Sequence, residues 1–132
     1  MQLRKSIQRR ICSALKYHII KEEEFCLIKI SGETRKNETI LAKAVLSPYL
    51  IENGIRMIVD LQELGKFEPV NLVGVLNSIR KEVHLLRGDL KLCSLKPKLL
   101  NYLKQNRLDN FFQIYEDRET AIKSKWNNRV RK

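Results

Sequence analysis

Residues 55–93 read IRMIVDLQELGKFEPVNLVGVLNSIRKEVHLLRGDLKLC, and the pattern of apolar residues changes twice along them. Residues 55–61 are almost continuously apolar, which is typical of a strand covered on both faces. From Pro69 onward the apolar residues recur at helical spacing, at Leu72, Leu76, Ile79, Val83 and Leu86. Residues 90–93 then predict a second strand. Strand, helix and strand form a βαβ unit, so we expect parallel strands and a right-handed crossover.

The two ends of this helix also carry signals. Pro69 suits the first helical position, where its missing N–H costs nothing, and Gly88 suits a left-handed residue just past the helix. The loop of residues 63–71 follows the carboxyl end of a strand and leads into the helix N-terminus. Free N–H groups and the helix dipole favour a negative charge or a partner's acceptors there. We therefore expect the 63–71 loop to carry the function.

Two further strands are predicted before this unit. Residues 14–20 and residues 25–31 are rich in β-branched and aromatic side chains, and a charged turn at 21–24 separates them. A connection this short predicts an antiparallel hairpin.

A helix is expected between the hairpin and residue 55. Asn37 can cap it, and Gly54 lies where it would end. Pro48 interrupts the helical pattern, so we expect a kink or two short helices. The apolar stripe of this helix would comprise Ile40, Leu41, Ala44, Val45, Leu50 and Ile51.

The remainder of the chain predicts two helices and one strand. Residues 94–106 form a helix with Asn106 as its C-terminal cap, residues 108–115 supply a turn and a short strand, and Asp117 caps a final helix. The resulting order is β-β-α-β-α-β-α-β-α. It predicts an α/β fold with a mostly parallel mixed sheet, an antiparallel N-terminal hairpin and about four helices.

The basic charge of the chain is concentrated at its ends. The 132 residues carry a net charge of +11, but residues 1–10 contribute +4 and residues 123–132 contribute +5, which leaves +2 for residues 11–122. We expect one domain over residues 14–123, between a basic tail or short helix at 1–13 and a basic tail at 124–132. Such tails aid solubility or contact nucleic acid or an anionic membrane surface weakly.

Composition favours a cytoplasmic protein. No apolar run approaches the roughly 20 residues that a membrane-spanning helix needs, and the start of the chain does not resemble a secretory signal. Cys12, Cys26 and Cys93 are far apart and lack CxxC spacing. They are typical of small core residues in a reducing compartment.

Signals for catalysis are weak. The chain contains no GxGxxG, phosphate-binding loop or GxSxG motif. His18 and His84 are not spaced as metal ligands, and the acids Asp60, Glu63 and Glu68 are more typical of solvated or capping groups than of an acid/base pair. We predict no enzymatic activity, no metal and no cofactor.

Several motifs, taken in order, resemble the STAS domain, which anti-sigma factor antagonists share with the cytoplasmic ends of sulphate transporters. The motifs are IKISGE at 28–33, VDL at 59–61, LVGVL at 72–76, RGDLKL at 87–92 and LDNFFQIYED at 108–117. The resemblance covers residues 14–123 and implies a STAS-like fold for that range.

The resemblance also bears on the 63–71 loop. In regulatory members this loop reads Asp-Ser-x-Gly, and a partner kinase that is also the anti-sigma factor phosphorylates the serine. Those positions correspond to Glu68, Pro69, Val70 and Asn71. Pro69 has no hydroxyl, so the resemblance implies that this switch is absent. Glu68 and Pro69 also suit an ordinary helix start.

The first functional hypothesis is a non-enzymatic STAS domain that docks an anti-sigma factor or serine kinase. Its expected contacts are Glu63, Lys66, Phe67, Glu68, Val70, Asn71, Ser78 and Arg80. Two alternatives remain: a non-switching subunit of a larger assembly, such as a lipid-transport ATPase or signalling complex, and a basic nucleic-acid-binding module that uses the tails. The sequence leaves a homodimer open.

Overall fold

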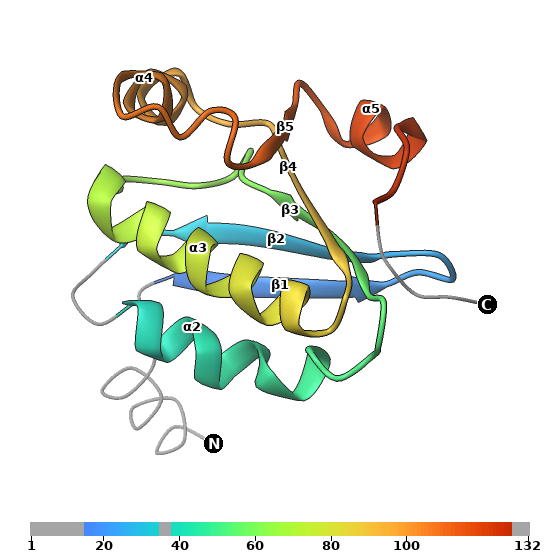
Figure 1. Cartoon of the computed structure of the whole chain (residues 1–132). Helices are drawn as coiled ribbons and strands as arrows, with labels where there is room; N and C mark the ends of the chain where they lie inside the picture. Colours follow the sequence, from blue (N-terminus) through green and yellow to red (C-terminus); the bar gives the residue numbers. More distant parts are fainter. Residues whose placement is uncertain (1–14, 35–37, 128–132) are drawn as a thin grey trace, which may run out of the picture.

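The computed structural model describes residues 15–34 and 38–127, which build one five-stranded sheet in the order β1-β2-β3-β4-β5 (Figure 1). The strands are β1 Leu15–Lys21, β2 Cys26–Gly32, β3 Arg56–Asp60, β4 Asp89–Cys93 and β5 Gln113–Tyr115. The helices are α2 Glu38–Leu46, the 3-10 helix η1 Ser47–Tyr49, α3 Pro69–Leu85, α4 Pro97–Gln105 and α5 Arg118–Lys123.

The strand pairing confirms the predicted mixed sheet. β1 and β2 form an antiparallel hairpin in which Leu15 pairs with Gly32 and Lys21 with Cys26. All other neighbouring strands are parallel. The element order is the predicted one, with η1 added after α2.

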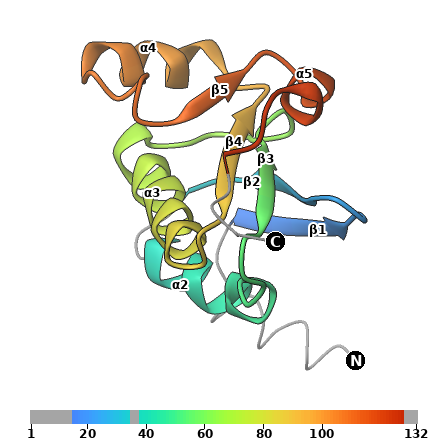
Figure 2. The same cartoon turned by 45° about the vertical axis from the view of Figure 1, so that its right-hand side comes forward.

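Apolar side chains form a core on each face of the sheet. The larger core lies under α2, α3 and α4, and the smaller one lies under α5 (Figures 1 and 2). β3 contributes to both, because Met57 and Val59 belong to the larger core whereas Ile58 belongs to the smaller. This two-sided burial explains the unbroken apolar run of that strand.

The predicted apolar stripe of α2 is wrong. Ala42 and Leu46 are buried, whereas Ile40 is 69% exposed and Ile51, after η1, is 72% exposed. α2 packs against α3, so it buries a narrow stripe of residues four apart. Pro48 gives the two short helices expected, since the α-helix ends at Leu46 and η1 follows directly. The proposed Asn37 cap and the tail of residues 1–13 lie outside the described residues.

Two further predictions of helix ends were wrong, and the first concerns Gly54: the helical segment before β3 ends at Tyr49 and not at Gly54. Pro69 occupies the start of α3 after Glu68, and the Asp117 side chain accepts a hydrogen bond from the Thr120 N–H at 2.8 Å, both as expected. Gly88, however, is not the left-handed residue after α3; Arg87 is, with φ 59°. Gly88 is required for space, because a Cβ there would lie 2.2 Å from the carbonyl oxygen of Ile55.

A lysine is buried in the smaller core, which the sequence did not indicate. Lys91 on β4 is fully buried, and its ammonium group donates to the carbonyl oxygens of Ala121 at 2.8 Å and Ser124 at 2.9 Å. Trp126 and Asn127 also contact the sheet region, through Lys91 and Asp89 respectively. These contacts lie beyond residue 123, the expected end of the domain.

No helix within residues 15–34 and 38–127 is long and apolar enough to cross a membrane.

Candidate functional site

The 63–71 loop lies on the surface at the carboxyl ends of the parallel strands β2, β3 and β4 (Figure 1). The side chains of Glu63, Lys66 and Glu68 are exposed, and Phe67 is half-buried. Val70, in the first turn of α3, is 67% exposed although it is apolar. The loop thus presents charged groups around an exposed apolar side chain.

The backbone of the loop is held against the end of β2. The Gly65 N–H donates to the Gly32 carbonyl at 2.8 Å, and the Thr34 N–H donates to the Lys66 carbonyl at 3.2 Å. The Glu68 N–H donates to Thr34 Oγ1 at 2.8 Å. A Cβ on Gly65 would lie 3.0 Å from the Gly32 oxygen, so a small residue allows this close approach. These bonds hold the backbone of the loop against residues 32–34.

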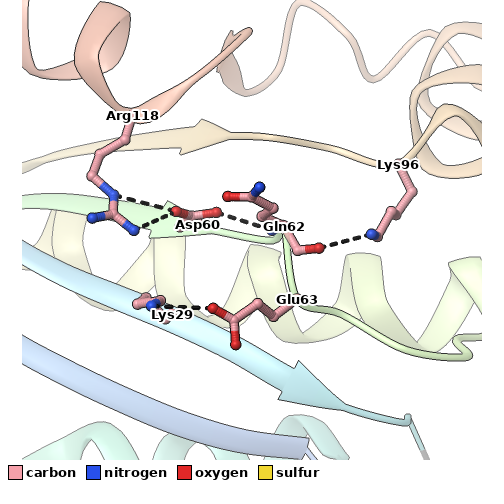
Figure 3. Close-up of polar contacts among 6 residues, drawn as sticks. All are labelled: Lys29, Asp60, Gln62, Glu63, Lys96 and Arg118. Atoms are coloured by element: carbon pink, nitrogen blue, oxygen red, sulfur yellow. Dashed lines mark hydrogen bonds and ion pairs between the residues drawn. The ribbon is translucent and has the colours of Figure 1, made fainter.

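Polar side chains tie the start of the loop to three other elements (Figure 3). Asp60, only 2% exposed, accepts from the Gln62 N–H at 2.9 Å and pairs with Arg118 of α5 at 3.0 Å. Glu63 pairs with Lys29 of β2 at 3.1 Å. Lys96, just before α4, donates to the Gln62 carbonyl at 2.7 Å (Figure 3).

Phe67 anchors the tip of the loop. Its ring packs against the larger core, and the Lys98 ammonium lies 5.3 Å from the ring centroid and 3.4 Å from the Phe67 carbonyl oxygen. A concavity of about 620 Å³ lies beside it. Its lining comprises Glu33, Thr34, Gly65, Lys66, Phe67, Glu68, Lys96 and Lys98.

The N-terminus of α3 has no side-chain cap. Glu68 stands at the cap position with extended backbone, and its side chain makes no capping hydrogen bond. Pro69 has no N–H to satisfy, whereas the next N–H groups of a helix have no partner within the helix itself. This end of α3 can therefore accept a negative group or a carbonyl from another molecule.

The structure brings together most, but not all, of the predicted contact residues. Glu63, Lys66, Phe67, Glu68, Val70 and Asn71 are on one continuous segment at the loop. Ser78 lies further along α3 in a groove against α2. Arg80 lies elsewhere, over the Phe111 ring at 3.8 Å.

Three residues that support the loop escaped the sequence analysis. Thr34, Lys96 and Lys98 are each more than thirty residues from the loop atoms they bind. A Lys-Pro-Lys segment or a threonine after a strand has no periodicity that would indicate such contacts. Only the parallel pairing of β2, β3 and β4 brings them together.

No group of three or more His, Cys, Asp or Glu side chains that could hold a metal ion occurs in the described part of the chain.

Comparison with solved structures identifies the fold as that of STAS domains and anti-sigma factor antagonists. This confirms the resemblance at the level of the fold. The sequence matches no family model and no curated protein.

Three solved structures illustrate the similarity. A STAS domain protein from Planctomyces limnophilus is 14% identical over 80% of this chain and 94% of its own, with a TM-score of 0.63. An anti-sigma factor antagonist from Mycobacterium paratuberculosis is 13% identical over 82% and 91%, with a TM-score of 0.62. Phosphorylated SpoIIAA from Bacillus is 17% identical over 81% and 96%, with a TM-score of 0.58.

Proposed function

We propose that this chain is a non-enzymatic protein-binding domain that docks a partner protein through the 63–71 loop. The observation that carries the proposal is the exposure of Val70 at the start of α3. An exposed apolar side chain that follows exposed charges along the chain, here Lys66 and Glu68, suits an interface core with a polar rim. The loop is rigidly held, so little conformational entropy is lost on binding.

The class of partner comes from the fold. Proteins named anti-sigma factor antagonists share this fold, and the STAS resemblance implies an anti-sigma factor or serine kinase as the partner. The uncapped N-terminus of α3 favours a partner that places a carboxylate or carbonyl group there. Lys66, Lys96 and Lys98 outnumber Glu33 and Glu68 around the concavity, and this positive excess favours an acidic segment on that partner.

Regulation would differ from that of SpoIIAA, which has been solved in phosphorylated and unphosphorylated forms. Pro69 occupies the position that the resemblance assigns to the phosphorylated serine. A phosphate would add nearly two negative charges at the start of α3. Without a hydroxyl at residue 69, docking would not be switched off at this position.

A pair of matched variants tests the docking surface. Val70 and Leu85 are exposed apolar residues at opposite ends of α3, 67% and 77% exposed. We expect Val70→Asp to lose a partner that wild-type protein captures in an affinity pull-down, and Leu85→Asp to retain it. Thermal unfolding should show that both variants remain folded. Val70 is preferable to Phe67, whose packing against the core would confound the result.

The identity of the captured partner separates the two protein-binding functions. A kinase-like protein, identified by mass spectrometry, would support the anti-sigma factor antagonist function. A stable stoichiometric complex without a kinase would support the alternative, a non-switching subunit of a larger assembly, which the absence of a hydroxyl at Pro69 also suits. Equal capture by Val70→Asp and Leu85→Asp would contradict docking through the loop.

A further inference from the structure

Exposed apolar side chains gather on α2 and on the residues that follow it. Within residues 15–34 and 38–127, seven large apolar side chains are exposed, and four of them belong to residues 40–51. They are Ile40, Val45, Tyr49 and Ile51, which are 69%, 39%, 43% and 72% exposed. Such a concentration on a soluble domain indicates a surface that another segment or molecule covers.

One side of α2 is already occupied by α3. Lys43 pairs with Glu82 of α3 at 3.9 Å, and the two helices pack along each other. Leu41 and Val45 each lie two residues from Lys43, which places them about 200° around the helix from it. They therefore share the side of α2 that is turned away from α3, and Tyr49 follows four residues after Val45. We call Leu41, Val45 and Tyr49 the outer face of α2.

The outer face of α2 lies toward the β1 edge of the sheet. The helices α4, α3 and α2 follow one another across the sheet in the same direction as the strands from β5 to β1 (Figures 1 and 2). Tyr17 and Ile19 of β1 pack against the larger core but are only partly buried. Within the described residues, the larger core is thus incompletely covered between β1 and α2.

The segment that precedes β1 has the pattern and the position to cover this gap. Residues 1–14, which lie outside the described residues, carry Leu3, Ile7 and Ile11 at intervals of four. This spacing is typical of an apolar stripe along one side of a helix. The segment leads directly into Leu15, which is 3% exposed and belongs to the larger core. The chain therefore enters β1 beside the incompletely covered region.

The register of the hairpin sets the direction of such a helix. Leu15 pairs with Gly32 at the end of β2, and α2 begins soon afterwards, at Glu38. A helix that leads into β1 alongside α2 therefore runs antiparallel to α2, which brings opposite ends of the two helix dipoles together. A helix over residues 3–13 would be about 16 Å long, against about 20 Å for α2 with η1. The two apolar stripes thus match in length.

We propose that residues 3–13 form a helix whose apolar stripe packs antiparallel on the outer face of α2. Ile11 then lies near Leu41, and Leu3 lies near Tyr49. The covalent link to β1 favours this segment over a second copy of the chain, because a short connection gives an effective concentration on the order of millimolar. A helix in this place also shields the β1 edge strand from pairing with another strand. The proposal is independent of docking through the 63–71 loop.

Paramagnetic relaxation enhancement in the full chain locates the segment. Cys26 and Cys93 are buried, so in a Cys12→Ser background a nitroxide thiol reagent labels Lys5→Cys alone. Residue 5 is off the apolar stripe, so the label does not enter the proposed contact. We expect the amide signals of residues 45–51 to lose most of their intensity, because residue 5 would lie beside η1.

Matched variants test the contact from both sides. Ile7→Asp places a charge in the apolar stripe and should restore the signals of residues 45–51, whereas Gln8→Asp adds the same charge off the stripe and should not. On the other partner, Val45→Asp should restore the signals, and Leu85→Asp, at a 77% exposed position of α3, should not. The amide spectrum of each variant reports whether the domain is folded.

Three results would overturn the proposal. The first is attenuation confined to residues next to Leu15, which a segment without a fixed position would give. The second is unchanged attenuation in both Ile7→Asp and Val45→Asp. The third is attenuation of ¹⁵N-labelled protein by a separate spin-labelled copy, which would assign the outer face of α2 to a contact between two copies.

Discussion

The ammonium group of Lys91 lies 3.8 Å from the centroid of the Trp126 ring, on the face of the sheet opposite α3. The same group donates to the carbonyls of Ala121 and Ser124 and to the Ser124 hydroxyl. Burial is the main cause that lowers the pKa of Lys91, and Arg56 lowers it further, whereas Asp89 opposes the shift. The buried ammonium group is thus surrounded by three acceptors and two aromatic rings, since the Tyr115 ring centroid also lies 5.3 Å away.

Replacing this lysine should loosen the segment after α5. Lys91→Met leaves the Ser124 carbonyl without its donor and removes one of the two donors to the Ala121 carbonyl, the other being the Ser124 hydroxyl at 2.9 Å. We therefore expect a loss of about 1–3 kcal/mol in the free energy of unfolding. Trp126 is the only tryptophan in the chain, and its fluorescence should shift to the red as it becomes exposed. Urea denaturation followed by fluorescence measures both effects. The control is Lys104→Met, which changes an exposed lysine of α4. If both variants behave identically, Lys91 does not hold the segment after α5 in place.

Removing Arg118 should lower the free energy of unfolding, because the buried Asp60 carboxylate then loses its ion-pair partner. Asp60 is 2% exposed, whereas Arg118 is partly exposed, so we expect Arg118→Ala to lower the free energy of unfolding by about 2 kcal/mol, less than for a fully buried pair. Adding Asp60→Asn should recover part of that loss, because the amide oxygen can still accept from the Gln62 N–H. A double-mutant cycle by chemical denaturation measures the coupling. Additive effects would mean that the pair contributes nothing.

A methyl group at residue 88 should be poorly tolerated. The Cβ of Gly88→Ala would meet the Ile55 oxygen at 2.2 Å, and the strand start cannot retreat because the Asp89 N–H donates to that oxygen at 2.8 Å. We expect a loss of about 3 kcal/mol in stability. Arg87→Gly, one residue earlier, should instead stabilise by about 1 kcal/mol, since it relieves a left-handed side chain. A melting temperature that falls for Gly88→Ala and rises for Arg87→Gly would confirm that Gly88 is required for space and that Arg87 is the left-handed residue. Shifts of the same sign would contradict this.

The buried thiols should be unreactive in the folded protein. Burial is the main cause that raises the pKa of Cys93 to about 11, and Asp60 adds to it; burial also raises the pKa of Cys26. In a Cys12→Ser background, we expect no labelling by a thiol reagent at neutral pH until the chain unfolds. Because the folded pKa of Cys93 is raised, its contribution to stability is present below about pH 9 and is lost as the pH rises toward 11. The Cys12→Ser/Cys93→Ala variant should lose less free energy of unfolding between about pH 9 and pH 11 than Cys12→Ser does, as measured by chemical denaturation at each pH.

Restoring a hydroxyl at residue 69 should restore the switch. We expect Pro69→Ser to accept phosphate when incubated with a kinase-like partner and ATP, and to release that partner, because the phosphate charge would lie at the docked helix end. Pro69→Ala controls for the loss of proline and should bind without modification. Intact-mass analysis detects the phosphate. A phosphorylated Pro69→Ser protein that stays bound to the partner would contradict a switch at this position.

The order and type of the elements could be predicted because the spacing of apolar residues and the turn residues are signals within each short segment of sequence. Pro69 and Asp117 lie at helix starts, and the apolar run at 55–61 is a strand buried on both faces. The prediction of the buried face of α2 was wrong because this helix packs against another helix, α3. The spacing of apolar residues such as Ile40 and Val45 does not reveal which element a helix packs against. Gly88 was predicted to be left-handed because glycine favours that conformation. Its actual role is to leave space for the backbone of Ile55, which lies more than thirty residues earlier in the chain.

The contacts that hold the 63–71 loop were beyond sequence reasoning for the same reason. The position of the 63–71 loop after a strand follows from the sequence pattern, but the bonds from Thr34, Lys96 and Lys98 depend on the sheet register. The stacking of Arg80 on Phe111 likewise joins α3 to the turn before β5. Arg80 was predicted to join the contacts of the loop because it is near the loop along the chain, whereas in the structure its guanidinium group lies over the Phe111 ring.

The order of the strands in space equals their order along the chain, and this has a consequence for synthesis. The larger core gains its strands and helices step by step as translation proceeds, whereas Leu27, Ile58 and Cys93 on the other face wait for residues 118–127. A nascent chain on the ribosome therefore carries an open apolar surface until that segment leaves the exit tunnel. Chaperones that recognise exposed apolar surfaces would have their main opportunity in this interval.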